Sequence, residues 1–412
     1  MKRFLKAAGP GILFASTAIG VSHLVQSTRA GADYGYGLLI AVVLVNLLKY
    51  PFFEYGSRYA LAMGESLIDG YRRMGRWMFA LYLGVTAITM FFVSAAVGAV
   101  TAGFLTRLFG LKDADAAWLT PLLFAVCAAL LMIGKYRLLD KTIKLIGSVL
   151  VIGTLIAFVK AIDSGAQFAS PGWQLPDFTN DAAAWPFLIA LMGWMPTAVD
   201  LSAWNSLWTL ERIKQTGYRP TLRETLLDFR IGYVISAVLA VVFVVIGALL
   251  MFGDPAGYPN SAPGFADRVL QVYTGIFGQW GYLVMAVAAF SIMFGTCIAV
   301  FDGYARAAVK SMEVAGIRSK LGSSKHGYST VVLLTAGGAF AIIHFFGAGL
   351  TSLIDVATTL SFLVAPVIAA ANFYLVKSAN FPKAQQPGAL LTVLSWVGLV
   401  FLIAFTAAFV LS

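Results

Sequence analysis

The chain has 412 residues, of which 59% are hydrophobic and only 12% are charged, whereas soluble domains carry roughly 25% charged residues. This composition excludes a soluble globular protein and predicts an integral membrane protein. The net charge of +10 does not indicate a nucleic-acid partner, because the basic residues fall in loops between apolar segments, where they set membrane orientation. The two cysteines, Cys127 and Cys297, lie in apolar runs and imply no disulfide framework.

Eleven segments are predicted to cross the membrane, because each offers about 20 mostly apolar residues. The first segment follows basic residues, as in a signal peptide, but no small-residue cleavage site follows it, so we expect it to remain as a helix. Residues 264–274 are amphipathic and predict a helix along the membrane interface. The predicted spans are 9–32, 37–63, 77–109, 118–136, 143–162, 185–210, 231–252, 277–309, 331–346, 350–376 and 390–411.

Positive charge alternates between successive loops. Lysines and arginines follow the second, sixth, eighth and tenth spans and surround the turn between the fourth and fifth, whereas residues 163–184 and 253–263 contain none. Because cytoplasmic loops carry the excess of Lys and Arg, we expect a multi-pass protein of the cell membrane with a cytoplasmic N-terminus and an external C-terminus. No linker divides the chain, so residues 1–412 are predicted to form a single transmembrane transporter-like domain.

Two spans are interrupted at matching places. The first contains Gly20-Val-Ser-His23, and the sixth contains Gly193-Trp-Met-Pro-Thr-Ala-Val-Asp200. Because a second five-helix unit inserts with opposite orientation, we expect an inverted repeat of residues 9–162 and 185–376, with 390–411 as an extra helix. Matched broken helices indicate a transport site, since unwound backbone is tolerated where it lines a cavity. The alternative is a kink packed by neighbouring helices, with His23 as a satisfied core histidine.

The residues around the first break carry a family resemblance. The run GPGILFASTAIGVSHLVQSTRAGADYGYGLL resembles the first helix of the NRAMP divalent-metal transporters, in which Gly-Pro opens the helix, Asp-Pro-Gly-Asn breaks it and Gly-Ala-x-Tyr-Gly-Tyr closes it. The run LMGWMPTAVDL resembles that family's Met-Pro-His helix. The run FGTCIAVFDG in the eighth span has a weaker similarity to the same family. The resemblance covers the first ten spans. It implies an all-α, leucine-transporter-like fold of about eleven helices that works as a monomer.

The positions that bind metal in that family differ in this chain. Aligned without gaps, the family's metal-binding Asp falls on Gly20 and its Asn on His23, whereas its metal-binding Met matches Met195. The proton-linked His is replaced by Thr197, and the small residue one turn before the Met corresponds to Met192. We therefore expect the fold to transfer, while metal binding and proton coupling do not transfer residue by residue.

Two kinds of substrate remain open. A hard divalent cation prefers several oxygen ligands including a carboxylate, whereas the imidazole of His23 and the thioether of Met195 suit softer metals such as copper or zinc. Bare N–H groups at the broken helices would instead favour an anionic or small organic solute. The candidate substrate-binding residues are Gly20, Ser22, His23, Met192, Met195, Thr197, Asp200 and Thr359, with His23 and Met195 as the candidate metal ligands.

Ionisable residues inside predicted spans are costly and therefore indicate gates or ion pathways. Glu54 and Arg58 stand four residues apart in the second span, so they can pair on one helix face, and Asp355 opens the polar run DVATTLS. We treat these three residues as candidates for coupling or gating. Arg29 and Asp33 have the same four-residue spacing and are expected to line an outer vestibule.

These features predict a secondary-active transporter that moves a metal cation by alternating access, through an atypical site without the usual carboxylate. The alternative is a transporter of the same fold for a non-metal solute, coupled to another ion or uncoupled. Enzyme motifs such as His-Glu-x-x-His and Gly-x-Ser-x-Gly do not occur, so we expect no enzymatic activity. We also expect no cofactor, and the bilayer and a small ion or solute as partners.

Overall fold

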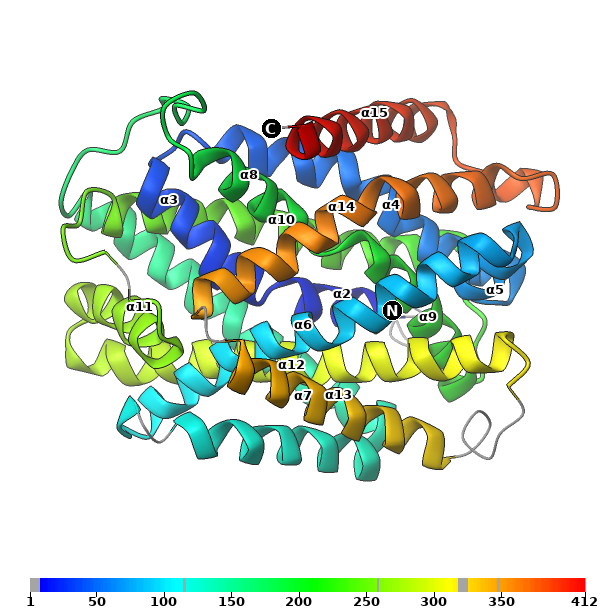
Figure 1. The fold of residues 1–412 in the computed structure, drawn as a ribbon, viewed down its shortest axis with the longest axis horizontal. Helices are drawn as coiled ribbons and strands as arrows, with labels where there is room; N and C mark the ends of the chain where they lie inside the picture. Colours follow the sequence, from blue (N-terminus) through cyan, green and yellow to red (C-terminus); the bar gives the residue numbers. More distant parts are fainter. Residues whose placement is uncertain (1–7, 114–115, 258, 318–324, 347–348, 412) are drawn as a thin grey trace.

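The structure is a computed structural model that describes residues 8–113, 116–257, 259–317, 325–346 and 349–411. Within these ranges the chain forms helices and no strand (Figure 1). Seven of the described helices are long and apolar enough to cross a membrane. The other predicted spans correspond to two broken helices and one long bent helix.

The first predicted span is broken into three pieces near the middle of the molecule. Helix α2 (Pro10–Ala18) begins with a proline at its first position, where the missing N–H would be unpaired in any case. After Ile19 and Gly20 the chain continues as a π-helical segment, η1 (Ser22–Ser27), and then as α3 (Thr28–Tyr34). The break therefore lies at the place that the sequence predicts.

The next two predicted spans, 37–63 and 77–109, correspond closely to α4 (Leu39–Met63) and α6 (Arg76–Leu108). Between them lies a short helix that was not predicted, α5 (Leu67–Met74). Helix α4 ends at Gly64 in the left-handed conformation, which glycine adopts at little cost. Helix α5 starts with a capping box in which Ser66 and Asp69 bond to each other's backbone N–H groups.

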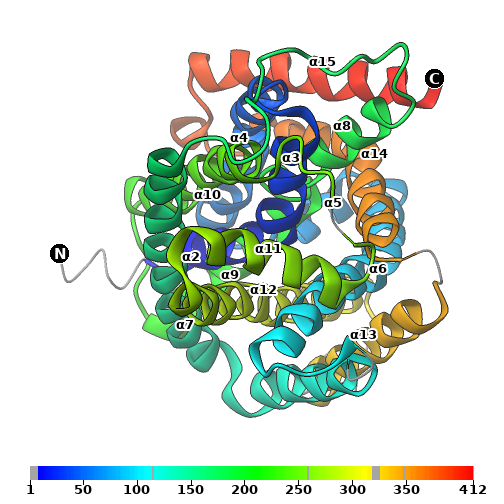
Figure 2. The same cartoon turned by 90° about the vertical axis from the view of Figure 1, so that its left-hand side faces the viewer.

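The fourth and fifth predicted spans differ from the structure. The sequence predicts two helices with a turn between them, but the structure has one continuous helix of 49 residues, α7 (Ala116–Ser164). Its two arms meet at a bend (Figures 1 and 2). Residues 135–146 contain neither Gly nor Pro, and the Lys, Arg and Leu residues there are good helix formers. The expected turn is therefore helical.

The second half repeats the pattern of a broken helix followed by long ones. The sixth predicted span forms α8 (Ala184–Gly193), a 3-10 turn η3 (Val199–Leu201) and α9 (Ser202–Thr216). The predicted amphipathic segment lies within α11 and is confirmed as a helix. The remaining elements are α10 (Leu222–Met251), α11 (Ala262–Phe277), α12 (Gln279–Val314), α13 (Lys325–Phe345), α14 (Leu350–Lys377), η4 (Lys383–Gln385) and α15 (Ala389–Leu411).

The two halves exchange contacts reciprocally. Helix α4, which follows the first broken helix, packs along α9, and α10, which follows the second, packs along α2 and α3. Figure 1 shows the broken helices at the centre and α15 on the outside, where it packs on α4 and α14. This exchange is what an inverted repeat produces, because each half places its broken helix against the other half.

Basic loops lie at one end of the molecule and acidic loops at the other. The loops after α4, α9 and α14 lie at one end, to the right in Figure 1, and the loop of residues 165–183 lies at the other. We call these the basic end and the acidic end. Arg72, Arg73 and Arg219 belong to the first, and Asp177 and Asp181 to the second. The alternation that the sequence predicts therefore corresponds to a spatial separation.

Candidate functional site

The break in the first helix packs closely against Thr296 of α12. A Cβ atom on Gly20 would lie 2.7 Å from both Cγ2 and Oγ1 of Thr296, so only glycine fits. The Thr296 hydroxyl lies 2.9 Å from the carbonyl oxygen of Ser16 and 3.2 Å from that of Ile19. It can therefore donate to the carbonyl groups that the break leaves without helical partners. Thr296 was not singled out from the sequence.

His23 is fully buried and points into the packing between the first broken helix and α10. Its Nε2 lies 2.9 Å from the carbonyl oxygen of Ser236, which accepts only, so Nε2 carries a proton. Its Nδ1 lies 2.7 Å from Oγ of Ser22, and the ring meets Phe243 edge-on. Both ring nitrogens thus have protein partners, which is the arrangement of a satisfied core histidine.

Ser22 connects the two breaks. Its Oγ lies 2.6 Å from the carbonyl oxygen of Ala18, on its own helix, and 3.4 Å from that of Pro196, in the second broken helix. The serine therefore lies where the unwound segments cross, which is the arrangement expected of matched broken helices.

The break in the second broken helix is held by a lysine from α4. Lys49 is fully buried, and its Nζ donates to the carbonyl oxygens of Met192 at 2.6 Å, Gly193 at 2.9 Å and Thr197 at 3.4 Å. Gly193 fits closely against α14, because a Cβ there would lie 2.1 Å from the carbonyl oxygen of Thr358. Lys49 is not among the candidate residues of the sequence analysis. Its position in the apolar run IAVVLVNLLKYPFF was the signal that could have found it.

The remaining candidates on the second broken helix are buried. Met195 is fully buried, and its Sδ lies 3.8 Å from Oγ of Ser27. Met192 is also buried, and its contact with Lys49 is made by its backbone carbonyl oxygen. Among the described residues Asp200 Oδ1 has no hydrogen-bond partner, although the carboxylate is close enough to Lys49 to interact electrostatically.

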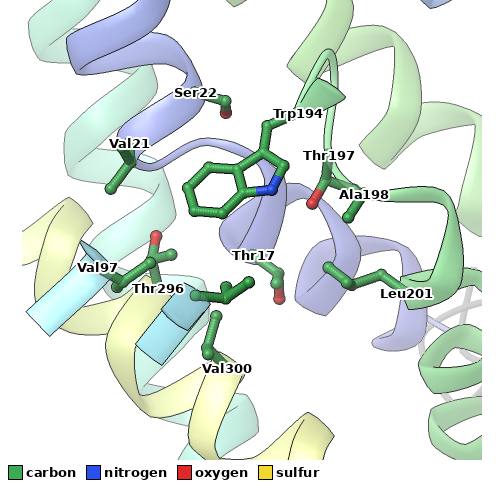
Figure 3. Close-up of a pocket in the computed structure, with 11 residues that line it drawn as sticks. Thr17, Val21, Ser22, Val97, Trp194, Thr197, Ala198, Leu201, Thr296 and Val300 are labelled. Atoms are coloured by element: carbon green, nitrogen blue, oxygen red, sulfur yellow. The ribbon is translucent and has the colours of Figure 1, made fainter. Parts of the chain in front are cut away.

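A cavity of about 20 Å³ separates the two breaks, which is room for about one water molecule. Figure 3 shows the Trp194 indole across its middle, with Ser22, Thr197 and Thr296 around it. The Trp194 Nε1 donates to Oγ of Ser361 at 2.9 Å. None of the described residues that line this cavity is acidic. The lining is completed by Thr17, Val21, Val93, Val97, Ala198, Leu201 and Val300.

A second cavity, of about 430 Å³, opens toward the acidic end, and we call it the outer vestibule. Arg29 and Asp355 pair on its wall, with Nη1 and Oδ1 at 2.8 Å, and Gln26 Nε2 donates to the same Oδ1 at 3.0 Å. Asp33 and Thr359 also line this vestibule. Thr359 and Asp355 are therefore separated from the central cavity that Ser22 and Thr197 line.

Comparison with known proteins identifies the family. A model of the family described as natural resistance-associated macrophage protein-like, abbreviated Nramp, matches residues 11–412. The chain belongs to the Nramp family. An uncharacterized protein of Pasteurella multocida is 35% identical over 407 residues, which are 98% of this chain and 92% of that protein.

Solved structures of an Nramp transporter share the fold of this chain. Two variants of a manganese transporter from Eremococcus coleocola have TM-scores of 0.70 and 0.71 at 15% and 14% identity, and the match covers 98% of this chain and 86% of each. The all-α, leucine-transporter-like fold predicted from the sequence is thereby confirmed. Nramp proteins are membrane transporters, so the expectation that the chain is not an enzyme is also confirmed.

The gating candidates of this Nramp chain lie at the basic end. Glu54 is fully buried and accepts from Nη2 of Arg58 at 2.6 Å and from Nη2 of Arg230 on α10 at 3.4 Å. Arg58 also donates from Nη1 to the carbonyl oxygen of Gln385 at 2.6 Å. This network ties α4 to α10 and to the turn before α15, so the expected pairing of Glu54 with Arg58 is present as a contact.

No preformed cluster of ionisable or thiol ligands marks a metal site in the part of the chain that the structure describes. No three His, Cys, Asp or Glu side chains gather there closely enough to hold an ion. Neither His23 nor Met195 is among the described residues that line the central cavity.

Proposed function

We propose that this protein is a secondary-active transporter that moves a metal cation by alternating access, with the central cavity between the two broken helices as its substrate site. The observation that carries the proposal is the crossing of the two breaks at Ser22 and Pro196, beside a mainly apolar cavity whose lining includes four hydroxyl-bearing residues. Unwound backbone of this kind binds substrate and ions in transporters built from inverted repeats. Membership of the Nramp family supports the same reading.

The proposed site differs from a carboxylate-based metal site. Gly20 stands where the resembling family places its metal-binding Asp, and Thr296 fills the space beside it. The available ligands are the hydroxyls of Ser22 and Thr197, the carbonyl oxygen of Pro196 and, after a small rearrangement, the Met195 thioether. Because thioether ligands favour softer metals, we propose zinc or copper rather than magnesium as the substrate.

The outer vestibule and the network at the basic end would close the two sides of this site in turn. The Arg29–Asp355 pair would close the acidic end, and Glu54 with Arg58 would close the basic end. We further propose that the basic end faces the cytoplasm, because Lys and Arg accumulate on that side in membrane proteins.

A non-metal solute is the second candidate, and a specific observation favours it. None of the described residues that line the central cavity is acidic, and the Lys49 ammonium already occupies the carbonyl oxygens of the second break. A cavity without a lining carboxylate suits an anionic or neutral solute better than a bare cation.

The test is uptake into liposomes reconstituted with the purified protein. We expect saturable uptake of Zn²⁺ or Cu⁺ that exceeds uptake of Mn²⁺ and Mg²⁺. Met195→Ala should raise the concentration for half-maximal uptake at least about tenfold, which is the order of effect of a lost ligand or supporting partner. Ser22→Ala and Thr197→Val should also reduce uptake, because they remove hydroxyls from the cavity.

Thr335→Val is the matched control, because among the described residues the buried Thr335 hydroxyl donates within its own helix, to the carbonyl oxygen of Val331. It should leave uptake unchanged. Folded protein that moves none of the four metals would contradict the metal assignment. Saturable uptake of a small carboxylate by that same protein would establish the second candidate.

A further inference from the structure

Lys49 lies outside the proposed substrate site and the residues of the family resemblance, in an environment of its own. Its side chain enters from α4 and ends at the unwound C-terminal end of α8, where it is completely buried. Three backbone carbonyl oxygens lie within hydrogen-bond distance of Nζ, those of Met192, Gly193 and Thr197. We call these three oxygens the carbonyl cluster.

The carbonyl cluster matches a lysine ammonium group in number and kind. A lysine ammonium has three N–H donors and no acceptor, and the cluster offers three acceptors. The last carbonyl groups of a helix also carry the negative end of its dipole, which attracts a cation. In transporters with broken helices, such carbonyl groups at the end of a half-helix coordinate a free ion.

Asp200 supplies the opposite charge. It lies in η3, on the far side of the same break, and is buried with Oδ1 free of hydrogen bonds among the described residues. A buried carboxylate is strongly destabilised unless a cation is near, and Lys49 is close enough to act on it electrostatically. The charge balance of the break therefore comes from the chain itself.

We propose that Lys49 is a tethered cation: its ammonium group occupies the carbonyl cluster that would otherwise take a free monovalent ion. One consequence of the inference rests on the proposed transport function: no free coupling ion binds at the end of α8. Lys49 thereby also determines where a substrate cation binds. Its charge repels the cation from these three oxygens, so the substrate binds at the Ser22 side of the cavity.

The test is the cation dependence of thermal unfolding of the purified full chain in detergent. Lys49→Ala removes the ammonium group and leaves a space of matching shape. Its melting temperature should be below that of the wild type and should rise by a few degrees with Na⁺, K⁺ or ethylammonium, relative to the larger choline at the same ionic strength. The wild-type melting temperature should be the same in all four salts.

Two controls separate charge from shape and from general salt effects. The uncharged 1-propanol, which is close in size to ethylammonium, should not restore Lys49→Ala. Lys160→Ala, which removes an exposed lysine on α7, should behave like the wild type. Equal stabilisation of Lys49→Ala by choline and the small cations, or by 1-propanol, would overturn the inference.

A second pair of variants decides the matter if Lys49→Ala yields no folded protein. Lys49→Arg keeps a cation at this position, and Lys49→Met keeps a similar volume without charge. We expect folded protein, measured as a monodisperse peak in size-exclusion chromatography, from the arginine variant in at least severalfold excess over the methionine variant. Equal yields from the two would show that only packing matters. These measurements contain no substrate, so failure of metal uptake would leave their result intact.

Discussion

At the scale of single residues, the site is formed by small groups that fill spaces a larger side chain would need. Gly20 has no side chain, and the Thr296 hydroxyl takes that space and bonds to the carbonyl oxygen of Ser16. The space available at position 20 in the first broken helix therefore depends on the side chain of Thr296 on α12, which is 276 positions away by residue number. A carboxylate at position 20 would need the Thr296 side chain to shift.

Gly20→Asp should consequently destabilise the protein, because the new Cβ would lie 2.7 Å from the Thr296 side chain. Overpacking of this kind costs about 1–3 kcal/mol. The loss should fall by at least half in the double variant Gly20→Asp with Thr296→Ala, which removes both contacting atoms. Thermal unfolding of the two single variants and the double variant gives the coupling energy, and strictly additive losses would contradict the proposed contact.

At the scale of elements, the broken helices are held at their outer ends by polar contacts rather than by apolar packing alone. Helix α3 is tied to α14 through Arg29 and Asp355, and the guanidinium of Arg29 also lies 4.9 Å from the Phe187 ring of α8. These contacts join the first broken helix to two elements of the second half. They are suited to open and close, because an ion pair exchanges partners with water at small net cost.

Asp355→Asn should loosen this contact and raise the population open toward the acidic end. The pair is partly exposed, so we assign it about 0.5–1 kcal/mol, which corresponds to a change of about two- to fivefold in the open population. The measurement is the rate at which a membrane-impermeant thiol reagent modifies Ser27→Cys, a position that is fully buried.

Glu313→Gln is the control for that experiment, because its pair with Lys310 is largely exposed and lies near the basic end. It should leave the modification rate unchanged. A rate that Asp355→Asn lowers, or that both variants raise equally, would exclude the Arg29–Asp355 pair as a gate at the acidic end.

At the scale of the whole molecule, the two ends differ in charge and in their polar networks. The basic end carries the buried Glu54 with its arginine partners, and the acidic end carries the outer vestibule. Alternating access requires these two closures to be opened one at a time, with the central cavity between them.

The orientation of these ends in the membrane is open to a direct test. We expect Ser170→Cys, in the loop of residues 165–183, to react with an impermeant thiol reagent in intact cells. Ala384→Cys, in η4 at the basic end, should react only after the membrane is permeabilised. Both positions are exposed, and the two natural cysteines are buried, so the wild type should give little background. The reverse pattern would place the basic end outside.

The sequence by itself determined the class of protein, the places of the breaks and the separation of charge. These follow from local properties: apolar runs of sufficient length, Gly and Pro in the first and sixth spans, and Lys and Arg between them. It did not predict the continuous α7, because charged residues that resemble a turn in a hydropathy pattern are also good helix formers.

Only the tertiary structure decided which candidate residues face the cavity. Ser22 and Thr197 line it, whereas His23 bonds to Ser236 on α10 and Thr359 lies in the outer vestibule. The contacts of Thr296 with the first break and of Lys49 with the second join residues far apart in the chain. No local pattern encodes such contacts, because they depend on how the two halves pack across each other.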